Sequence, residues 1–449
     1  MKVLLLNQFF HPDLAATAQL ATDLAEDLVE AGFEVTALAA RGAYMGGGRL
    51  AATETYRGIR IERVRCTSLG KASIGRRLLD YGSFFAAAMA RVLTGPRHDV
   101  VVAMSTPPLV AAIAALARSG PRPLALRQAQ GERTGADWRS SAGQAQGERT
   151  GADWRSSAGQ AQGERTGAEP RSRTGTRFVY WLQDVYPELA VEFGLFGERS
   201  LAARLFNAAS RWTLRRADAV VVLGDAMGER VRAKGVSAAR VHVLPNWADG
   251  AAVCPAPGEA DEFLRANGLQ GKRVVLYSGN MGRAHDLSTI LAAARLLRSR
   301  REIAFVFVGD GAKRGEIEAA ARELPSIHLL PYQPRERLAA SLSAGEVHLV
   351  TQEPFTVGLV EPSKLYGAMA AGRPVLYIGP PETEAARTVE REGIGAVFSN
   401  GDAAGAAAAI DALLARSAEF GARARTAFLA RYDRRLRTAQ FAGLLRSVS

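Results

Sequence analysis

Apolar residues gather in short runs along this chain, and the stretches between the runs have apolar positions every three or four residues. The runs KVLLL (2–6), DVVVAM (99–104) and RVVLYSG (273–279) show no regular polar alternation. Strands buried on both faces have this composition, and the intervening spacing is that of amphipathic helices. The pattern therefore predicts an α/β protein whose mostly parallel sheets carry helices on both faces.

The predicted strands form two groups, one in each half of the chain. They are 2–6, 34–38, 59–64, 99–104, 177–182, 218–224 and 241–245, followed by 273–279, 305–311, 328–331, 346–352 and 374–380. We predict two doubly wound, Rossmann-like domains that face each other across a cleft. The break falls in the Pro-, Gly- and Ala-rich stretch 245–258, which gives an N-terminal domain at 1–246 and a C-terminal domain at 247–425. A C-terminal helix in 426–449 can return to the N-terminal domain.

Residues 128–168 contain QAQGERTGADWRSSAG twice, followed by the first nine residues of a third copy. The repeat is rich in Gly, Ser, Gln, Arg and Ala and has no apolar face with which to stack. We therefore expect a disordered insert at about 119–176, and deletion of 128–168 should leave folding and activity nearly intact. A repeat that binds a partner is the alternative.

Composition narrows the class of protein. The net charge of +12 suits nucleic acid or an anionic membrane as a partner, but no nucleic-acid-binding motif is present, so we expect no nucleic acid. Cys66 and Cys254 are isolated, which fits a reducing compartment. The apolar stretch 100–117 is interrupted by Ser-Thr-Pro-Pro, which indicates a strand, a turn and a helix in a soluble, cytoplasmic protein.

The stretch EPSKLYGAMAAGRP (361–374) predicts a short helix of small residues. Ser363 is a suitable N-cap, Gly372 is placed to end the helix, and Pro374 prevents its continuation. Lys364 puts a positive charge in the first turn, where the helix dipole disfavours a cation unless an anion lies between. A bound phosphate would resolve that conflict. A solvated lysine on a tightly packed helix is the alternative.

Three strand ends in the second half bring glycines together with cations. Gly279 and Asn280 precede Arg283; Gly309, Asp310 and Gly311 precede Lys313; and the third loop leads to Ser363 and Lys364. Because ligands of doubly wound sheets bind beyond the carboxyl ends of the strands, these loops together predict a diphosphate cleft. The chain has no Walker A motif, and no Gly-x-Gly-x-x-Gly follows the first strand, so a P-loop NTPase or a nicotinamide or flavin enzyme is disfavoured.

Six segments together resemble glycosyltransferase family 4, which has the GT-B fold, and in it the bacterial surface-polysaccharide branch that includes fucosamine transferases. They are FFHPDLAATAQLATDLAEDLVEAGFEVTAL, WLQDVYPELAVEFGLF, VHVLPNWAD, LYSGNMGRAHDLSTIL, FVFVGDGAKRGEIE and EPSKLYGAMAAGRPV. The resemblance covers the chain apart from the insert. It implies a retaining transfer from a UDP- or GDP-sugar, with the donor in the C-terminal domain and a lipid-linked or saccharide acceptor on the N-terminal side.

The resemblance extends to individual residues. It implies donor binding by Ala16, Thr17 and Tyr332 together with the strand-end residues above, and it makes Lys364 the residue that neutralises the leaving diphosphate. Asp184 is a candidate for orienting sugar or acceptor hydroxyls, and Glu361 for contacting the donor sugar. For Asp184 the alternative is a turn or cap before the helix at 186–193. We expect no metal and no other cofactor.

The chain departs from the family at two points. Many members carry two glutamates separated by seven residues, but those positions are Leu359 and Gly367 here. Many also hold the diphosphate with an arginine and a lysine whose positions are Asn280 and His285 here, with Arg283 between them. His285 can face the donor or help to cap the next helix, and His11 can be a site residue or an ordinary loop histidine. These losses keep two alternatives open: a nucleotide-sugar 2-epimerase, and a catalytically degenerate nucleotide-sugar-binding subunit of a polysaccharide assembly complex.

The segment 71–93 places Ile74, Leu78, Tyr81, Phe85 and Met89 at helical spacing, with four basic residues at other positions. A basic, apolar helix of this kind can bind the anionic inner face of the cell membrane, where lipid-linked acceptors reside. Packing of the stripe on its own sheet is the alternative.

Overall fold

A computed structural model describes residues 1–42, 48–69, 74–118 and 175–449 of the chain. The repeat at 128–168 lies outside the described residues, as do Lys71 and the side chain of Ile74. The stretches 1–118 and 176–449 belong to one compact unit that contains two sheets.

The first sheet has eight strands, seven of them parallel. The strands are β1 (Lys2–Leu6), β2 (Glu34–Ala40), β3 (Thr53–Tyr56), β4 (Ile59–Val64), β5 (Val100–Ala103), β6 (Arg177–Trp181), β7 (Ala219–Val222) and β8 (Val241–Val243). Their order is β3-β4-β2-β1-β5-β6-β7-β8, and β3 alone runs antiparallel, against β4. β3 was not predicted, because TETY is a polar edge strand without an apolar run.

The second sheet has six strands, all parallel. They are β9 (Arg273–Ser278), β10 (Ile303–Val308), β11 (Ile327–Leu330), β12 (Val347–Thr351), β13 (Val375–Ile378) and β14 (Gly395–Phe398), in the order β11-β10-β9-β12-β13-β14. The short edge strand β14 was not predicted. The doubly wound α/β class predicted from the apolar runs is confirmed.

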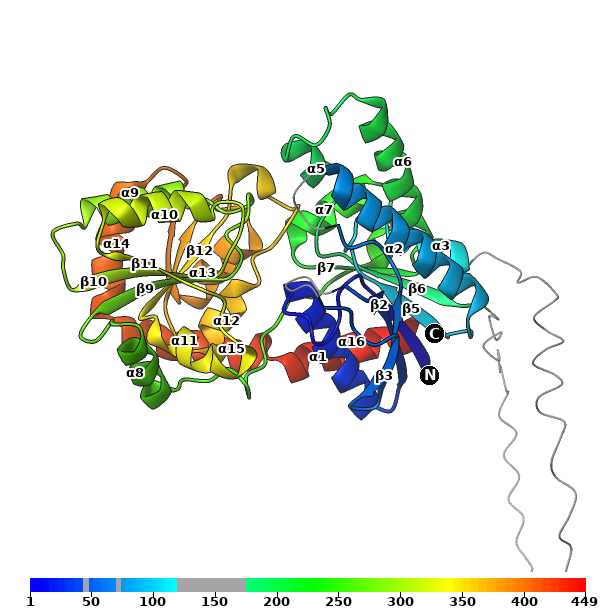
Figure 1. The fold of residues 1–449 in the computed structure, drawn as a ribbon, viewed down its shortest axis with the longest axis horizontal. Coiled ribbons are helices and arrows are strands. Elements are labelled where there is room, and N and C mark those ends of the chain that lie inside the picture. Colours follow the sequence, from blue (N-terminus) through cyan, green and yellow to red (C-terminus); the bar gives the residue numbers. More distant parts are fainter. Residues whose placement is uncertain (43–47, 70–73, 119–174) are drawn as a thin grey trace, which may run out of the picture. The chain divides into compact units, whose positions relative to one another are not determined.

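Helices cover both faces of each sheet, as Figure 1 shows. The larger ones are α1 (Ala16–Glu30), α2 (Ile74–Thr94), α3 (Ala111–Ala117), α6 (Leu201–Arg216), α7 (Asp225–Ala233), α8 (Pro257–Ala266), α9 (Ser288–Leu296), α10 (Arg314–Glu323), α11 (Leu338–Ala344), α12 (Lys364–Ala370), α13 (Glu384–Glu392), α14 (Ala403–Ala415), α15 (Ser417–Arg431) and α16 (Arg434–Val448). A single turn, α5 (Glu188–Glu192), follows β6, and the 3-10 turns η1 (Ala238–Arg240), η2 (Arg335–Arg337) and η3 (Pro354–Thr356) lie in loops.

The core explains why the strands lack polar alternation. In β1, Leu4 and Leu6 belong to the apolar cluster on one face of the sheet, and Val3 and Leu5 belong to the cluster on the other face. β10 divides in the same way between the two clusters of the second sheet. Because every side chain of β10 and every side chain of β1 except Lys2 is buried, both faces must be apolar.

The last helix, α16, packs on α1 of the first sheet's layer (Figure 1). Its first residue, Arg434, is buried and donates to the carboxylates of Asp23, Glu26 and Asp27 on α1. Farther along α16, Phe441 packs edge-on against Trp181 of β6, with 5.1 Å between the ring centres. After forming the second sheet, the chain therefore returns and ends with α16 packed against the first sheet and its helix α1.

The helix α2 differs from the stripe predicted for it. Phe85 and Met89 pack against the core beside the fully buried Phe84. Leu78 and Leu79, nearer the start of the helix, are 63% and 61% exposed. The stripe is therefore a core contact in its second half and a solvent-facing surface in its first. Within the described stretches, no helix combines the length and the apolar character that crossing a membrane requires.

Candidate active site

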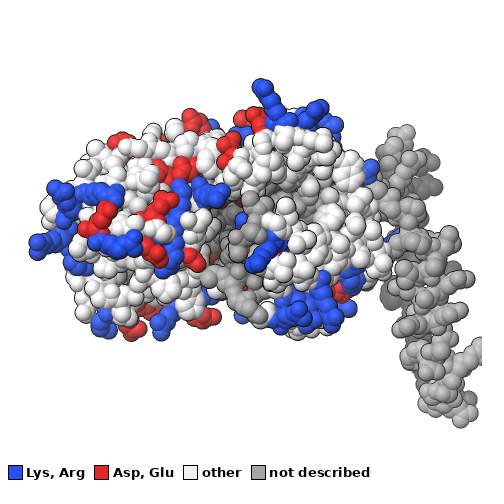
Figure 2. Space-filling model, turned by 45° about the horizontal axis from the view of Figure 1, so that its top comes forward, with Lys and Arg blue, Asp and Glu red and all other residues white. Residues whose placement is uncertain are grey.

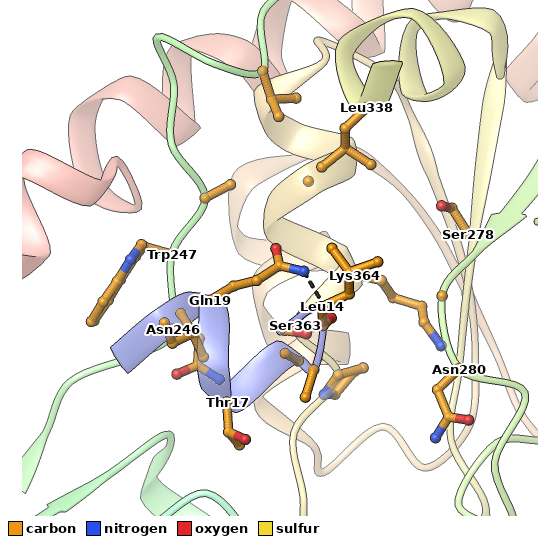
Figure 3. Close-up of a pocket in the computed structure, with 18 of the residues that line it drawn as sticks. Leu14, Thr17, Gln19, Asn246, Trp247, Ser278, Asn280, Leu338, Ser363 and Lys364 are labelled. Atoms are coloured by element: carbon orange, nitrogen blue, oxygen red, sulfur yellow. Dashed lines mark hydrogen bonds between the residues drawn. The ribbon is translucent and has the colours of Figure 1, made fainter. Parts of the chain in front are cut away.

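A cavity of about 540 Å³ lies at the carboxyl ends of strands from both sheets. Its wall includes Phe9, Ala16, Thr17, Asp23, Thr106, Asp184, Asn246, Trp247, Gly279, Asn280, His285, Tyr332, Arg335, Glu361, Ser363, Lys364 and Gly367. Figure 3 shows the labelled residues of this wall. A cavity with apolar walls and a few polar groups is the usual form of a ligand site.

The strand order explains the position of the cavity. In the second sheet the order reverses between β9 and β12, and in the first between β1 and β5. At such a switch point the loops of neighbouring strands turn to opposite faces and leave a crevice. Gly279 and Asn280 follow β9, and Phe9 and Thr106 follow β1 and β5, so both switch points contribute to the wall.

The helix α12 starts and ends where the sequence predicted. Gly372 has φ of +64°, its N–H donates to the Met369 carbonyl, and the next N–H donates to Ala368. This is a Schellman ending, which favours glycine because of the left-handed backbone. Ser363 occupies the N-cap position of α12 as predicted, but its side chain makes no capping hydrogen bond. Ser363 instead lines the cavity.

Lys364 holds its ammonium group at the cavity wall. Its Nζ donates to the Tyr277 hydroxyl at 2.6 Å, lies 3.2 Å from His285 Nε2 and sits 4.0 Å from the centre of the Tyr277 ring. In Figure 3 the side chain extends from α12 toward Asn280. Among the described residues no carboxylate forms an ion pair with it, and burial lowers the pKa of Lys364 well below its usual range.

His285 faces the same ammonium group. Its Nδ1 lies 2.6 Å from the Thr351 carbonyl oxygen, which can only accept, so Nδ1 carries the proton and the Nε2 lone pair points at Lys364. Burial and the nearby Lys364 charge lower the pKa of His285 well below its usual range. His285 does not cap α9. The neighbouring Asp286 does, because its carboxylate accepts a hydrogen bond from the Thr289 N–H.

Lys313 has a different environment. Its Nζ donates to Glu353 Oε1 and to the His285 carbonyl, both at 2.6 Å, and the residue lies outside the cavity lining. The Glu353 carboxylate already balances its charge. Of the two lysines in the strand-end loops, only Lys364 therefore offers its charge to a ligand.

Four carboxyl groups line the cavity, those of Asp23, Asp184, Asp249 and Glu361. Burial raises the pKa of Asp184 to about 6 and the pKa of Glu361 to about 8. No hydrogen bond of the Asp184 carboxylate to α5 occurs in the described chain, so the capping alternative is not the one adopted. Glu361 Oε1 is buried without a hydrogen-bond partner in the same residues. Asp184 and Glu361 are linked through the backbone, because Asp184 pairs with Val360 in an isolated antiparallel bridge.

Most of the predicted site residues meet at this cavity, and four do not. Those on its wall are Ala16, Thr17, Asp184, Gly279, Asn280, Tyr332, Glu361, Ser363 and Lys364. Arg283 is absent from the wall because its guanidinium donates to the Phe193 carbonyl at 3.2 Å. His11, for which the sequence left a site role and a loop role open, does not count among these four; it also lies outside the wall, and its ring stacks on Tyr56.

Gly309, Asp310 and Gly311 are the other three that lie outside the wall. They follow β10, which is one strand farther from the switch point than β9. A Cβ on Gly309 would come within 2.1 Å of the Gly279 carbonyl oxygen, and the Asp310 carbonyl accepts from the Met281 N–H. These residues therefore support the loop after β9 from behind.

Sequence reasoning missed several residues of the wall. Asp23 on α1 is one, and it accepts from Arg335, also on the wall, at 2.9 Å. Gln183 and Asn246 are others; their buried side-chain amides form two reciprocal hydrogen bonds of 3.2 and 2.9 Å. The signal for Asp23 was available, since Asp23, Glu26 and Asp27 put three carboxylates on one face of a helix.

Two family profiles match the chain. The profile described as a glycosyl transferase 4-like domain matches residues 151–247, and that of the glycosyl transferases group 1 matches residues 272–416. The chain belongs to the GT-B glycosyltransferases of family 4. The resemblance of the six sequence segments to this family is thus confirmed. Gly367 stands where many family members have their second glutamate, and it lies on the cavity wall. Leu359 stands where they have the first, and it lies in the core.

Curated relatives agree with the family. The chain is 34% identical to the probable glycosyltransferase WbjE of Pseudomonas aeruginosa over 49% of its own length and 56% of the relative's. It is 31% identical to WcaI of Escherichia coli K12, a putative colanic acid biosynthesis glycosyl transferase, over 48% and 54%. The chain thus spans about half the length of the curated relatives it matches.

Solved structures share the fold. A sucrose-phosphate synthase from Thermosynechococcus elongatus superimposes with a TM-score of 0.69 at 16% identity, covering 100% of this chain and 99% of the other. Anabaena HepE in complex with UDP-glucose gives 0.64 at 16% identity, with full coverage of both chains. These likenesses establish the GT-B fold of the family-4 chain. In the part of the chain that is described, no group of three or more His, Cys, Asp or Glu side chains is arranged to hold a metal ion.

Proposed function

We propose that this family-4 chain is a retaining glycosyltransferase that moves a sugar from a UDP- or GDP-sugar to a lipid-linked or saccharide acceptor in bacterial polysaccharide synthesis. The observation that carries the proposal is the Lys364 ammonium group. It lies on the wall of a cavity at the β9/β12 switch point, and none of the described carboxylates pairs with it.

A nucleotide diphosphate fits this charge. An ammonium group that contacts a phosphate oxygen forms a charge-assisted hydrogen bond, which contributes about 1.5–3 kcal/mol. HepE, which shares the fold, has been solved with UDP and with UDP-glucose. WcaI, which shares sequence, is named for colanic acid biosynthesis. These relatives support a nucleotide sugar as the donor and a polysaccharide pathway as the setting.

The chemistry follows from where charge develops. When the bond between the anomeric carbon and the diphosphate breaks, negative charge grows on the departing phosphate oxygen, and Lys364 is placed to stabilise it. Glu361, whose pKa is raised to about 8, is largely protonated at neutral pH and can donate to a sugar hydroxyl oxygen. Asp184, with a pKa raised to about 6, is largely ionised at pH 7 and can accept from an acceptor hydroxyl.

In this proposal the cation of the leaving-group site is a lysine, and no metal or other cofactor is required. We therefore expect turnover to persist in excess EDTA after extensive dialysis. Restoration of a lost activity by Mg²⁺ or Mn²⁺ alone would contradict this part of the proposal.

Incubation with labelled UDP- and GDP-sugars and a polyprenyl-diphosphate-linked sugar tests the function. Transfer of label to the acceptor, with the anomeric configuration of the donor retained in the product by NMR, is the expected result. D184N should keep donor binding and lose most transfer. An epimerised nucleotide sugar formed without acceptor would favour the 2-epimerase, and binding without transfer would favour the degenerate subunit.

We also propose that the acceptor is met at an anionic membrane surface, at the start of α2. Leu78 and Leu79 are exposed there beside the exposed Arg76 and Arg77. Figure 2 shows separate groups of basic side chains on the visible face of the N-terminal half, with broad uncharged areas between them. Lysine and arginine near anionic lipid each contribute about 1 kcal/mol to binding.

A further inference from the structure

The cavity wall carries less positive charge than a diphosphate requires. Its lysines and arginines are Lys364 and Arg335, and Arg335 already pairs with Asp23 at 2.9 Å. The diphosphate of a nucleotide sugar carries two negative charges. One ammonium group without a carboxylate partner leaves one of them unbalanced, and a poorly solvated site penalises that imbalance.

His285 is the group nearest to Lys364 that can supply a second charge. Its Nε2 lies 3.2 Å from Lys364 Nζ, and both side chains are on the cavity wall. The ring cannot turn freely, because its Nδ1–H is held by the Thr351 carbonyl at 2.6 Å. Nε2 is therefore fixed beside the ammonium group, and its lone pair can take up a proton once Lys364 turns away.

The surroundings of the ring keep it neutral while the cavity holds no anion. The charged or titratable groups packed around it are Lys364 on α12, Lys313 before α10, Glu353 after β12, Tyr277 on β9 and the adjacent Asp286. The Glu353 carboxylate forms an ion pair with Lys313. The Asp286 carboxylate accepts hydrogen bonds from Ser288, Thr289 and Asn400. Lys364 and burial both lower the pKa of His285.

We propose that His285 is a further donor-binding residue, and that its ring takes up a proton from solvent when the diphosphate enters. The new N–H bond forms at Nε2, and the Lys364 ammonium group turns its hydrogen bond from the ring to a phosphate oxygen. Lys364 and the imidazolium then provide two cations for two negative charges. The inference rests on the proposed function, since it needs a nucleotide sugar in this cavity.

The direction of the pH effect follows from linkage. Binding raises the pKa of His285, so the complex holds a proton that the free protein lacks. Affinity must then be greatest at low pH and must fall as pH rises, by up to about tenfold per pH unit for one proton. Lys364, Glu361 and Asp184 also have shifted pKa values at this wall, so a variant at His285 is needed to separate the proton taken up by His285 from theirs.

Titration calorimetry with UDP-glucose and, separately, GDP-glucose at pH 6.0 to 8.5 tests the inference. Neither probe ionises in this range, so the proton count reports on the protein. Each titration is repeated in two buffers of different ionisation enthalpy to count the protons taken up. The variants are H285Q, which keeps an acceptor for Lys364 but cannot become a cation, and H285R, whose guanidinium group stays protonated across this pH range. H328Q is the matched control, because His328 lies on β11 outside the cavity lining.

We expect proton uptake in the wild type and in H328Q, and less uptake in H285Q. H285Q should bind roughly tenfold more weakly at pH 6.0 and approach the wild type at pH 8.5. H285R should bind more tightly than the wild type at pH 8.5, with a flatter profile. Equal proton uptake and equal pH profiles in the wild type and H285Q would overturn the role of His285 alone. Failure of the wild type to bind either probe at any pH would overturn the proposed function and this inference with it.

Discussion

Lys313 and Glu353 form an ion pair with 2.6 Å between Nζ and Oε1, and this pair removes one of the two lysine charges that the strand-end loops bring toward the cavity. Among the described residues, the side chains that accept from Lys364 are the neutral Tyr277 and His285. The two lysines are therefore unequal, although both follow strand ends of the same sheet.

This inequality gives the first prediction. K364A should weaken binding of the nucleotide-sugar donor by about 1.5–3 kcal/mol and lower turnover, because one charge-assisted contact is lost. K313A should change donor affinity much less, since Lys313 lies outside the wall. Isothermal titration of both variants with the donor checks this. Equal and negligible effects at the two positions would refute the site.

The buried Glu361 predicts a pH-dependent stability. Its pKa is raised to about 8 in the folded protein, whereas the usual value is 4.5. The folded state therefore holds a proton that the unfolded state releases, and stability is lost progressively as pH rises from about 4.5 to 8. E361Q cannot ionise, so its melting temperature relative to the wild type should rise across this window.

Thermal melts at half-unit intervals from pH 5 to 8.5 measure the difference. E336Q is the matched control, because Glu336 is an exposed glutamate in the same half of the chain. Parallel curves for E361Q and the wild type would mean that Glu361 is ionised in the folded protein throughout.

Arg434 should be the costliest single charge to remove. R434M removes the cation that Asp23, Glu26 and Asp27 share, so that Asp23 keeps only Arg335 and Glu26 only Arg57 as ion-pair partners among the described residues. Breaking a largely buried network of this kind costs about 3–5 kcal/mol. We expect a large drop in the denaturation midpoint in urea. R435M serves as the control, since the Arg435 side chain is 80% exposed on the same helix. A shift no larger than that of R435M would show that α16 does not depend on this network.

Membrane association should depend on the exposed start of α2. The wild type should sediment with vesicles that contain anionic lipid, bind less at high salt, and ignore neutral vesicles. L78S/L79S should reduce this binding. L296S/L429S is the control, because Leu296 and Leu429 are 58% and 52% exposed in the other half of the chain. Equal loss in both double variants, or indifference to lipid charge, would argue against a membrane role for α2.

The sequence by itself determined the local elements and the fold class. The run VLLL (3–6) is apolar at every position, which suits a strand buried on both faces, and Leu4 and Leu5 do lie in clusters on opposite faces. Gly372 ended α12 as predicted, because the left-handed backbone of that ending favours glycine over other residues. These features depend on neighbours within a few residues, so a pattern along the chain contains them.

Only the tertiary structure decided which predicted residues share a site. The glycine loops after β9 and β10 look alike in the sequence, but the strand order puts only the first at the switch point. Arg283 donates to the Phe193 carbonyl and Lys313 donates to Glu353, so neither offers its charge to the cavity. Lys364 remains at the cavity wall beside His285. Such partners lie tens of residues apart along the chain, and their pairing follows from how strands and loops pack rather than from any local pattern.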